Sequence, residues 1–240
     1  MKQALSLIII VFIVSCGQKQ QSENSNIELS SNHEVPGLQK VEVTTNNIDD
    51  VKGNMQLYER STVNDPWKMI MNFPVVVGKN GLAYDTTQIL SASFNKIKHE
   101  GDGCSPAGVF QLSKIFGYHI LSNLKMPYEQ VDENDLCVDD IQSNYYNTLI
   151  DDDTIDAKDY KSFERMKRED VQYEYGVWIN YNTDPQIPGR GSCIFLHVWK
   201  SDSTGTSGCT AMSKEDMLKL IYWLDEKKDP VLVQYVDHKK

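Results

Sequence analysis

A period-two alternation of side chains most constrains what this chain can fold into. It is clearest over residues 171–181, where Val171, Tyr173, Tyr175, Val177, Ile179 and Tyr181 share one face, and Gln172, Glu174, Trp178 and Asn180 share the other. Successive side chains of a β-strand point to opposite sides of the sheet, whereas a helix repeats every about 3.6 residues. The segment is therefore predicted to be a strand.

Most of the remaining chain shows similar short runs bounded by turn residues. Strands are predicted at 54–59, 67–73, 74–77, 109–113, 192–199 and 231–236. Pro74 has no amide hydrogen to donate to a neighbouring strand, so the two runs that meet at it are expected near a sheet edge. The long stretch 118–170 has mixed polarity and is interpreted as an insertion.

One helix is predicted over Ser213–Lys228. Ser213 and Asp216 have the spacing of a helix N-terminal cap, and the apolar stripe that follows is Met217, Leu220, Ile221 and Leu224. Asp229-Pro230 stops the helix. A second helix is expected within the insertion, at 156–167. The sequence thus predicts a mainly β domain with one or two packed helices and an α+β insertion.

The N-terminus has the pattern of an export signal. Lys2 precedes an apolar run, Leu5–Val14, which is shorter than the roughly 20 apolar residues that a membrane-spanning helix needs. Residues 1–16 are interpreted as a secretory signal peptide. Their Ile-Val-Ser-Cys ending resembles a bacterial lipobox, which would make Cys16 the lipidated first residue of the mature protein. An ordinary signal peptide with an incidental cysteine is the alternative.

Composition divides the rest of the chain. Residues 17–46 are rich in Gln, Ser and Asn and poor in apolar residues, so they are predicted to be a flexible tether. Residues 47–240 are long enough for one domain with a sizeable core. The net charge of −10, with no basic run, argues against nucleic-acid binding. The acidic stretch 129–159 lacks the ligand spacing of a calcium-binding EF-hand loop and is expected to be solvated.

His197 and Cys209 are the candidate catalytic residues. His197 lies on a predicted strand, and Cys209 follows Thr206-Ser207-Gly208 just before the predicted helix. An imidazole beside a thiol is the pair that a cysteine nucleophile requires, and a helix N-terminus would favour the thiolate. Backbone N–H groups around Gly208 could stabilise an oxyanion, and Thr206 and Ser207 offer hydroxyls nearby.

The same residues have structural interpretations. A cysteine before a helix is often a packed small hydrophobe, and a strand histidine is often hydrogen-bonded in a core. A metal site would need Cys193 and His197 with His119, Cys104 or Cys209, but no zinc-binding spacing is present, so neither a metal nor a cofactor is expected. Cys104 and Cys137 both lie in loop-like sequence and form the candidate disulfide.

Three segments together resemble the L,D-transpeptidase (YkuD-like) family. His197 followed by Ser207-Gly208-Cys209 is similar to its His…Ser/Thr-His-Gly-Cys signature. The segment from Glu100 to Phe110 is similar to its Thr-Pro-x-Gly-x-Phe element, and Pro74–Gly78 is similar to its early hairpin. The resemblance spans roughly residues 52–236, with 118–170 outside the common core.

The resemblance implies a β-sandwich-like or barrel-like catalytic domain that acts on peptidoglycan stem peptides in the bacterial envelope. Cys209 would be the nucleophile and His197 the base, with Gly208 and Ser207 shaping the oxyanion site. Two positions depart from the family pattern: Ser207 stands where a histidine is usual, and Ala211 where an arginine or asparagine is common. Arg190, Lys200 and Trp199 are therefore the candidate substrate-binding side chains.

Three functions follow as hypotheses. The first is a membrane-anchored lipoprotein facing the periplasm that forms or exchanges peptide bonds at L,D centres through a Cys209 thioester. The second keeps the same site but uses water as acceptor, as an L,D-carboxypeptidase or amidase. The third is a catalytically silent envelope-binding module, which the departures at Ser207 and Ala211 would suit.

Overall fold

The computed structural model describes residues 35–85 and 96–237. The predicted signal peptide, Cys16 and residues 17–34 of the predicted tether lie outside these ranges. No helix within the described ranges is long and apolar enough to cross a membrane.

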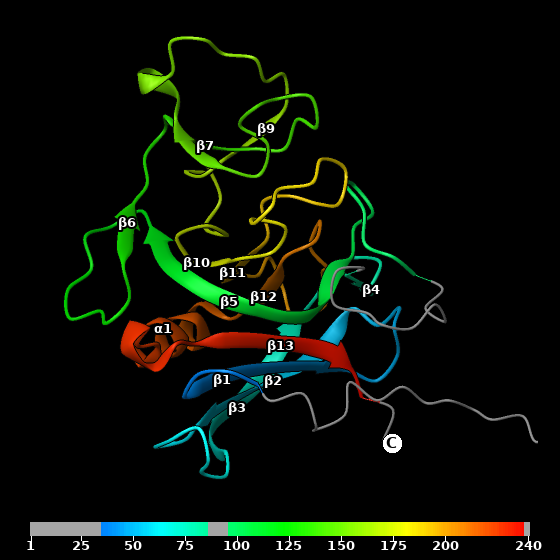
Figure 1. Ribbon diagram of the computed structural model, residues 1–240, viewed down its shortest axis with the longest axis vertical. Coiled ribbons are helices and arrows are strands. Elements are labelled where there is room, and N and C mark those ends of the chain that lie inside the picture. The colour runs from blue at the N-terminus through cyan, green and yellow to red at the C-terminus, as the bar shows by residue number, and fades with distance from the viewer. Residues whose placement is uncertain (1–34, 86–95, 238–240) are drawn as a thin grey trace, which may run out of the picture.

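The body of the protein is a β-barrel, shown in Figure 1. Eight strands follow one another around it in the order β10-β11-β12-β3-β2-β1-β13-β5, and pairing of β5 with β10 closes the ring. Their bounds are β1 Gln39–Thr45, β2 Lys52–Glu59, β3 Lys68–Val76, β5 Ser105–Gly117, β10 Tyr175–Ile179, β11 Phe195–Val198, β12 Thr210–Met212 and β13 Val231–Val236. Two short strands, β4 Leu82–Tyr84 and β6 Tyr128–Gln130, pair with β5. The prediction of a mainly β, barrel-like fold is confirmed.

Alternation explains the barrel strands. In β1, residues 39, 41, 43 and 45 are buried and those between are partly exposed. All five residues of β10 are buried, because the strand has the barrel core on one side and the insertion on the other. The predicted strand at 171–181 is therefore shorter than expected, and Val171 lies exposed.

Helix α1, Lys214–Trp223, packs against β10 and β11. The Ser213 hydroxyl accepts a hydrogen bond from the Asp216 amide, so the predicted N-terminal cap is confirmed. The apolar stripe of Met217, Leu220, Ile221 and Leu224 is fully buried. The helix ends five residues before the predicted Lys228, and Glu226–Lys228 form a separate 3-10 turn.

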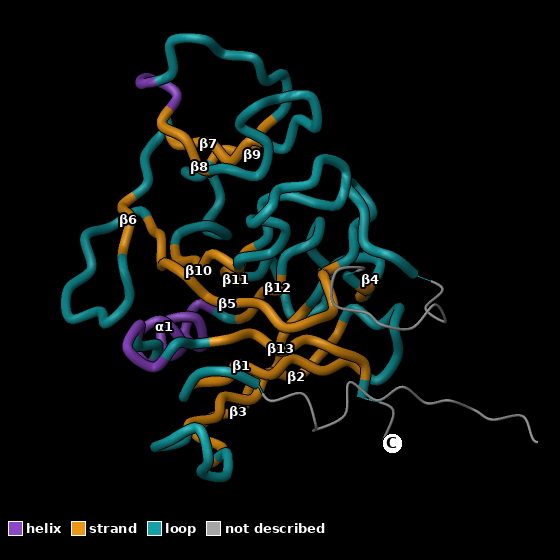
Figure 2. The backbone as a smooth tube through the Cα atoms, in the orientation of Figure 1, coloured by secondary structure: helices purple, strands orange, loops and turns teal. Residues whose placement is uncertain are grey.

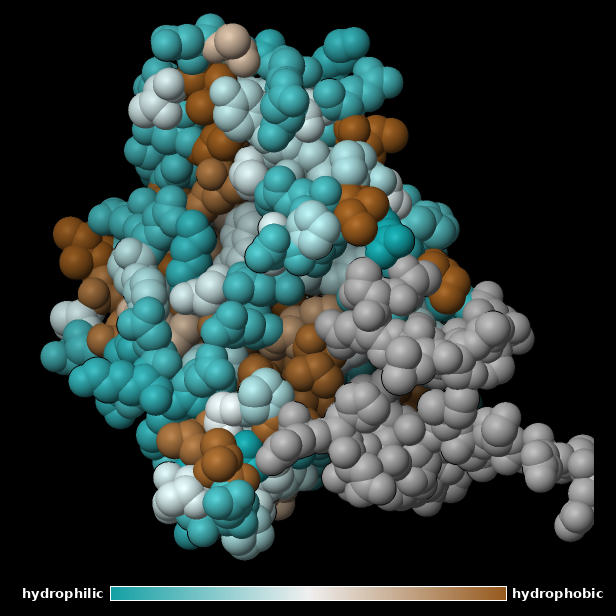
Figure 3. Space-filling model, in the orientation of Figure 1, coloured by the Kyte–Doolittle hydropathy of each residue, from teal (hydrophilic) through white to brown (hydrophobic). Residues whose placement is uncertain are grey.

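The insertion forms a second, three-stranded sheet above the barrel, as Figure 2 shows. Its strands are β7 Asp135–Val138, β8 Leu149–Asp151 and β9 Phe163–Arg165, with a 3-10 turn at Asp152–Thr154. Its visible surface is largely hydrophilic (Figure 3), as the acidic composition of 129–159 leads one to expect. The helix predicted at 156–167 is wrong, because these residues form irregular chain and then β9.

A disulfide between Cys137 and Cys193 fastens the insertion to the barrel, with Cα atoms 6.0 Å apart. The predicted pairing of Cys104 with Cys137 is wrong. Cys104 is instead a free, buried thiol whose sulfur contacts the Asn80 carbonyl, whereas Cys137 on β7 faces the chain that enters β11. The spacing of the cysteines along the sequence does not indicate which two of them pair.

The predicted tether is also too long. Residues 39–45 form β1, which pairs in parallel with β13 and antiparallel with β2 at the centre of the barrel sheet. The folded domain therefore begins before residue 47. Composition misled the prediction because the apolar positions of β1, Val41 and Val43, alternate with polar residues that face outward.

Candidate functional site

A cavity of about 400 Å³ lies between the insertion and one end of the barrel. His197 and Cys209 both line it, and so do Thr206, Ser207 and Gly208. Its remaining walls come from the segment before β5, from the insertion and from the loop after β11. The two candidate catalytic residues thus share one cavity.

Adjacent parallel strands position these two residues. Leu196 on β11 pairs with Thr210 on β12, and His197 pairs with Ala211. Side chains alternate along each strand, so His197 and Cys209, two residues apart in register, project from the same face of the sheet. Both side chains are almost fully buried.

The three segments that resemble the family's motifs contact one another at the backbone of Cys209. The Gly78 amide donates to the Ser105 hydroxyl at 2.8 Å, and that hydroxyl donates to the Cys209 carbonyl at 2.7 Å. Gly78 must lack a side chain, because a Cβ there would lie 2.4 Å from the Gly103 carbonyl oxygen. The early hairpin and the first residue of β5 therefore hold the backbone of the candidate nucleophile.

Thr206 has a structural place in the same loop. Its hydroxyl donates to the Cys209 carbonyl at 2.5 Å and accepts from the Gly208 amide at 3.1 Å. The Gly208 amide is thus engaged within the loop and is not directed at a substrate, which differs from the oxyanion role expected for it. Ser207 lies exposed at the cavity wall.

Burial raises the pKa of the Cys209 thiol well above its ordinary value, and the charge of Glu164 adds to this effect. The thiol donates to the Cys193 carbonyl and accepts from the Phe195 amide at 3.3 Å. The prediction that the helix N-terminus favours a thiolate is wrong, since strand β12 separates Cys209 from the Ser213 cap. Burial therefore favours the protonated thiol at this position.

His197 is neutral for a similar reason. Burial lowers the pKa of its imidazole to about 4. Its Nδ1 contacts the Val198 carbonyl at 2.8 Å, and this contact requires Nδ1 to carry the proton. Nε2 is then the nitrogen that can accept a proton.

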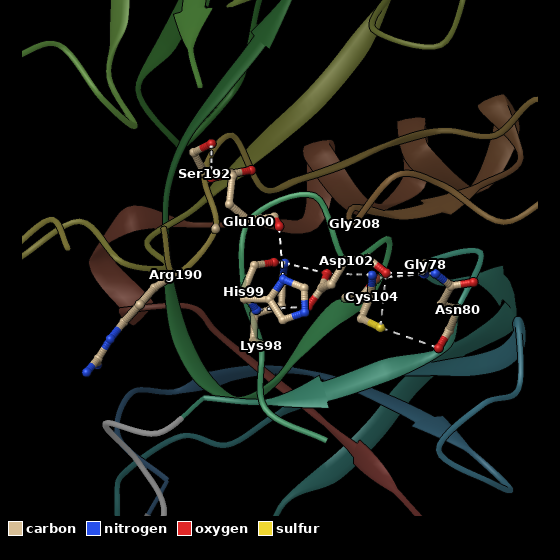
Figure 4. Close-up of polar contacts among 12 residues, drawn as sticks. Gly78, Asn80, Lys98, His99, Glu100, Asp102, Cys104, Arg190, Ser192 and Gly208 are labelled. Carbon is tan, nitrogen blue, oxygen red and sulfur yellow. Dashed lines mark hydrogen bonds and ion pairs between the residues drawn. The ribbon is translucent and has the colours of Figure 1, made fainter. Parts of the chain in front are cut away.

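The sequence analysis missed several charged residues of the cavity. Lys98, almost fully buried, pairs with Asp102 at 2.8 Å, and Glu100 accepts hydrogen bonds from the Tyr146 and Ser192 hydroxyls. Figure 4 shows this polar group extending toward Gly208. The charged residues immediately before the Ser-Pro-Ala-Gly element were the available signal for Lys98 and Glu100.

The insertion contributes Asp139, Glu164 and Arg168 to the cavity, and Tyr173 lines it beside His197, with ring centroids 5.1 Å apart. The Tyr173 hydroxyl donates to the Glu164 carboxylate at 2.5 Å. No motif marks these residues. Their only sequence signal was the position of Tyr173 in the alternating segment.

The candidate substrate-binding residues differ in whether they line the cavity. Lys200 lines the cavity, but Arg190 and Trp199 are not among its lining residues in the described chain. The Arg190 side chain extends away from Glu100 and Asp102 (Figure 4). Trp199 is half-buried, and its amide donates to the Met212 carbonyl at 2.8 Å.

Cys193 is oxidised and cannot ligate a metal in this state. Within residues 35–85 and 96–237, no group of three or more His, Cys, Asp or Glu side chains is arranged to hold a metal ion.

The fold and the site together define a mainly β barrel with a buried histidine on β11 and a buried cysteine directly before the neighbouring strand β12. The family model of the L,D-transpeptidase catalytic domain, YkuD, matches residues 51–233, so the chain belongs to that family. The family comprises L,D-transpeptidases, enzymes of peptidoglycan cross-linking that act on peptidoglycan peptides in the cell envelope. Neither the curated proteins nor the solved structures gave a match.

Proposed function

We propose that the protein is a cysteine acyltransferase that forms or exchanges peptide bonds at L,D centres of peptidoglycan stem peptides. The observation that carries this proposal is that His197 on β11 and Cys209, directly before the neighbouring strand β12, line one cavity. The cavity, about 400 Å³, has a volume in the usual range of ligand pockets and can hold part of a peptide.

The chemistry proceeds in two halves. The Cys209 sulfur attacks the carbonyl carbon between the L- and D-residues, and the C–N bond then breaks as the thioester forms. The D-residue leaves as an amine that has gained a proton. The acceptor amine next attacks the thioester, loses a proton and releases the thiol. His197, neutral in this cavity, is assigned to proton transfer with the two amines.

Two cationic side chains of the cavity support a peptide substrate with carboxylates. Ala211 cannot replace the arginine common at its position in the family, but Lys200 lines the cavity and Arg168 enters it from the insertion. Arg168 is held by two hydrogen bonds to Asp170, at 3.0 and 2.9 Å, so its guanidinium is fixed in place. These two cations are assigned to recognition of a stem-peptide carboxylate.

Incubation with a disaccharide-tetrapeptide and an amine acceptor tests the proposal. The expected result is a thioester mass on the Cys209 peptide, released D-alanine and a peptide joined to the acceptor, all absent from Cys209→Ala. Release of D-alanine with hydrolysed product alone would favour an L,D-carboxypeptidase. If wild-type protein binds the substrate but gives no acyl-enzyme, the acyltransferase proposal is wrong and a binding module remains.

The lipid anchor is a separate part of the proposal. The lipobox-like end of residues 1–16 supports lipidation of Cys16, which would hold the domain at a membrane through the residues that precede β1. Labelling of cells with a fatty-acid analogue should mark the wild-type protein and leave Cys16→Ala unmarked. Equal labelling of both would contradict it.

A further inference from the structure

The lead-in to β11, residues 191–194, contacts the Cys209 sulfur together with the first residue of the strand. The thiol donates to the Cys193 carbonyl at 3.5 Å, and the Phe195 amide donates to the sulfur at 3.3 Å. These two contacts use the hydrogen of the thiol and one lone pair of the sulfur. Because Cys209 lines the cavity, the second lone pair is the one available for attack on a substrate. The backbone on either side of the sulfur therefore sets the orientation of the candidate nucleophile.

The two groups that contact the sulfur are held by different parts of the molecule. Phe195 pairs with Trp178 of β10, and the Ile194 carbonyl accepts from the Ile179 amide at 3.2 Å. Cys193 precedes β11 and takes no part in this pairing. Its φ of +55° is a left-handed conformation, which a residue with a side chain adopts only where its surroundings hold it. The contacts that fix Cys193 must therefore come from elsewhere.

The insertion supplies these contacts. Cys137 on β7 is bonded to the Cys193 side chain, and Asn147 accepts a hydrogen bond from the Cys193 amide through Oδ1 at 2.9 Å. The backbone amide of Asn147 donates to the Val138 carbonyl at 2.7 Å, next to Cys137. Two neighbouring positions of the insertion thus hold one residue of the barrel, one through its side chain and the other through its backbone.

Asn147 also joins Cys193 to the chain that leaves β10. Its side-chain Nδ2 donates to the Tyr181 carbonyl at 2.9 Å and to the Asn182 carbonyl at 2.7 Å. With the bond from Cys193, the amide uses both of its donor hydrogens and its acceptor oxygen. The residue is almost fully buried, so loss of its side chain would leave buried polar groups without partners.

Tyr146, the residue before Asn147, makes a similar contact. Its hydroxyl accepts from the Gly191 amide at 3.1 Å and donates to the Glu100 carboxylate. The Ser192 hydroxyl donates to the same carboxylate at 2.9 Å (Figure 4). The lead-in to β11 is therefore tied to the insertion, both directly and through this carboxylate.

We propose that Asn147 and Tyr146 are positioning residues of the acyl transfer. They hold the lead-in to β11 so that the Cys193 carbonyl and the Phe195 amide keep the Cys209 sulfur turned toward the substrate. Neither side chain is among the residues of the described chain that line the cavity, so both act through Cys209. The inference deepens the proposed acyl transfer and rests on it.

Alkylation of the free thiols by iodoacetamide tests this without a substrate, and mass spectrometry follows each thiol separately. Asn147→Gly removes the side-chain amide and suits the left-handed backbone of that position, where φ is +56°. Release of Cys193 should expose the Cys209 sulfur and speed its alkylation at pH 7 by roughly tenfold, as expected for the loss of hydrogen bonds to a buried amide. Cys104, the other buried free thiol of the described chain, is the internal reference and should react at its wild-type rate.

Asn182→Gly is the matched control. Asn182 also has a left-handed backbone, with a φ of +53°, and its side chain also makes three hydrogen bonds, to Ile187 and Gly191. None of the three reaches Cys193. This variant should lose a comparable amount of stability in urea and should still alkylate Cys209 at the wild-type rate.

Acylation by the disaccharide-tetrapeptide gives the second readout. Asn147→Gly should lower the maximal acylation rate by roughly 10²-fold, because a displacement of a reacting group by about 1 Å has an effect of that size. The substrate concentration at half-maximal rate should stay near the wild-type value, since the side chain does not line the cavity. Tyr146→Phe removes only a hydroxyl and should change both readouts in the same direction, so it provides the test if the glycine variant does not fold. Asn182→Gly should acylate at the wild-type rate.

The outcomes are separable. Wild-type alkylation of Cys209 in both Asn147→Gly and Tyr146→Phe would overturn the positioning role. Faster alkylation of Cys104 and Cys209 together would also overturn it, because these side chains would then stabilise the whole fold. An equal, selective rise in Asn182→Gly would assign the effect to the loop after β10 and refute the role of Asn147. If alkylation behaves as expected but the wild-type protein forms no acyl-enzyme, the hold on the sulfur is supported and the acyltransferase is refuted.

Discussion

Removal of the Cys137–Cys193 disulfide should destabilise the domain by about 4 kcal/mol. The bond closes a loop of 56 residues, and the loss of loop-closure entropy in the unfolded chain gives about 4 kcal/mol at 25 °C for a loop of that length. For a domain of this size, that corresponds to a decrease in melting temperature of roughly 10 °C. The double variant Cys137→Ala/Cys193→Ala is the best perturbation, because a single change would leave an unpaired thiol close to Cys209.

Urea unfolding followed by tryptophan fluorescence measures the free energy. Wild-type protein unfolded in a reducing agent should match the double variant in oxidising buffer, since both lack the bond. Cys104→Ala is the matched control, because Cys104 is buried but forms no disulfide. Reducing agent should lower the free energy of unfolding of this variant by the same amount as that of the wild type.

Two results would refute this reasoning. If the double variant and the oxidised wild type differ by less than about 1 kcal/mol, the loop-closure account fails. If Cys104→Ala abolishes the effect of reducing agent, then Cys104 takes part in the disulfide and the pairing is wrong. Peptide mapping of the oxidised protein should find the cross-link between Cys137 and Cys193.

Three further predictions follow from the site. Gly78→Ala should lower stability by roughly 2–4 kcal/mol and weaken the support of Cys209, because its Cβ would overlap the Gly103 carbonyl. Gly101→Ala, where a Cβ meets nothing within 4 Å but the backbone φ is +70°, should cost only the backbone strain of about 1 kcal/mol in the same urea assay. The free energy of unfolding should decrease by roughly 3 kcal/mol as the pH drops from about 6.5 to about 4, because the unfolded chain binds a proton at His197 that the folded protein does not. His197→Asn should flatten that part of the pH profile of stability. Alkylation of Cys209 at pH 7 should be much slower than that of a free peptide thiol, because burial raises its pKa; a rate equal to the peptide's would contradict the buried geometry.

Local patterns predicted the barrel well. The strand at 231–236 and the capped helix start at Ser213 were correct because each depends on residues close together in sequence. The electrostatics of the site were not predictable in this way. The proximity of Cys209 to a helix in sequence suggested a stabilised thiolate, but three intervening residues form a strand, and burial then raises the thiol pKa.

The insertion was the hardest part to predict, and it contributes charged residues to the cavity that the sequence did not indicate. Strand β9 has only three residues, too few to show a period, and it exists because it pairs with β7 across 24 or more intervening residues. The fold of the insertion also brings Cys137 to its disulfide partner, Cys193. Glu164 reaches the cavity only as a result of both pairings, so no pattern within one segment could have joined it to Cys209.

Because the insertion supplies part of the cavity wall, the disulfide is also expected to position residues of the site. Cys137 connects to Glu164 through a strand pair and to Cys209 through Cys193, so loss of the bond should loosen the carboxylate from the sulfur even in protein that remains folded. The candidate pair on the barrel is then only part of the cavity, because the insertion supplies Asp139, Glu164 and Arg168 to its wall and the disulfide fastens the insertion to the barrel.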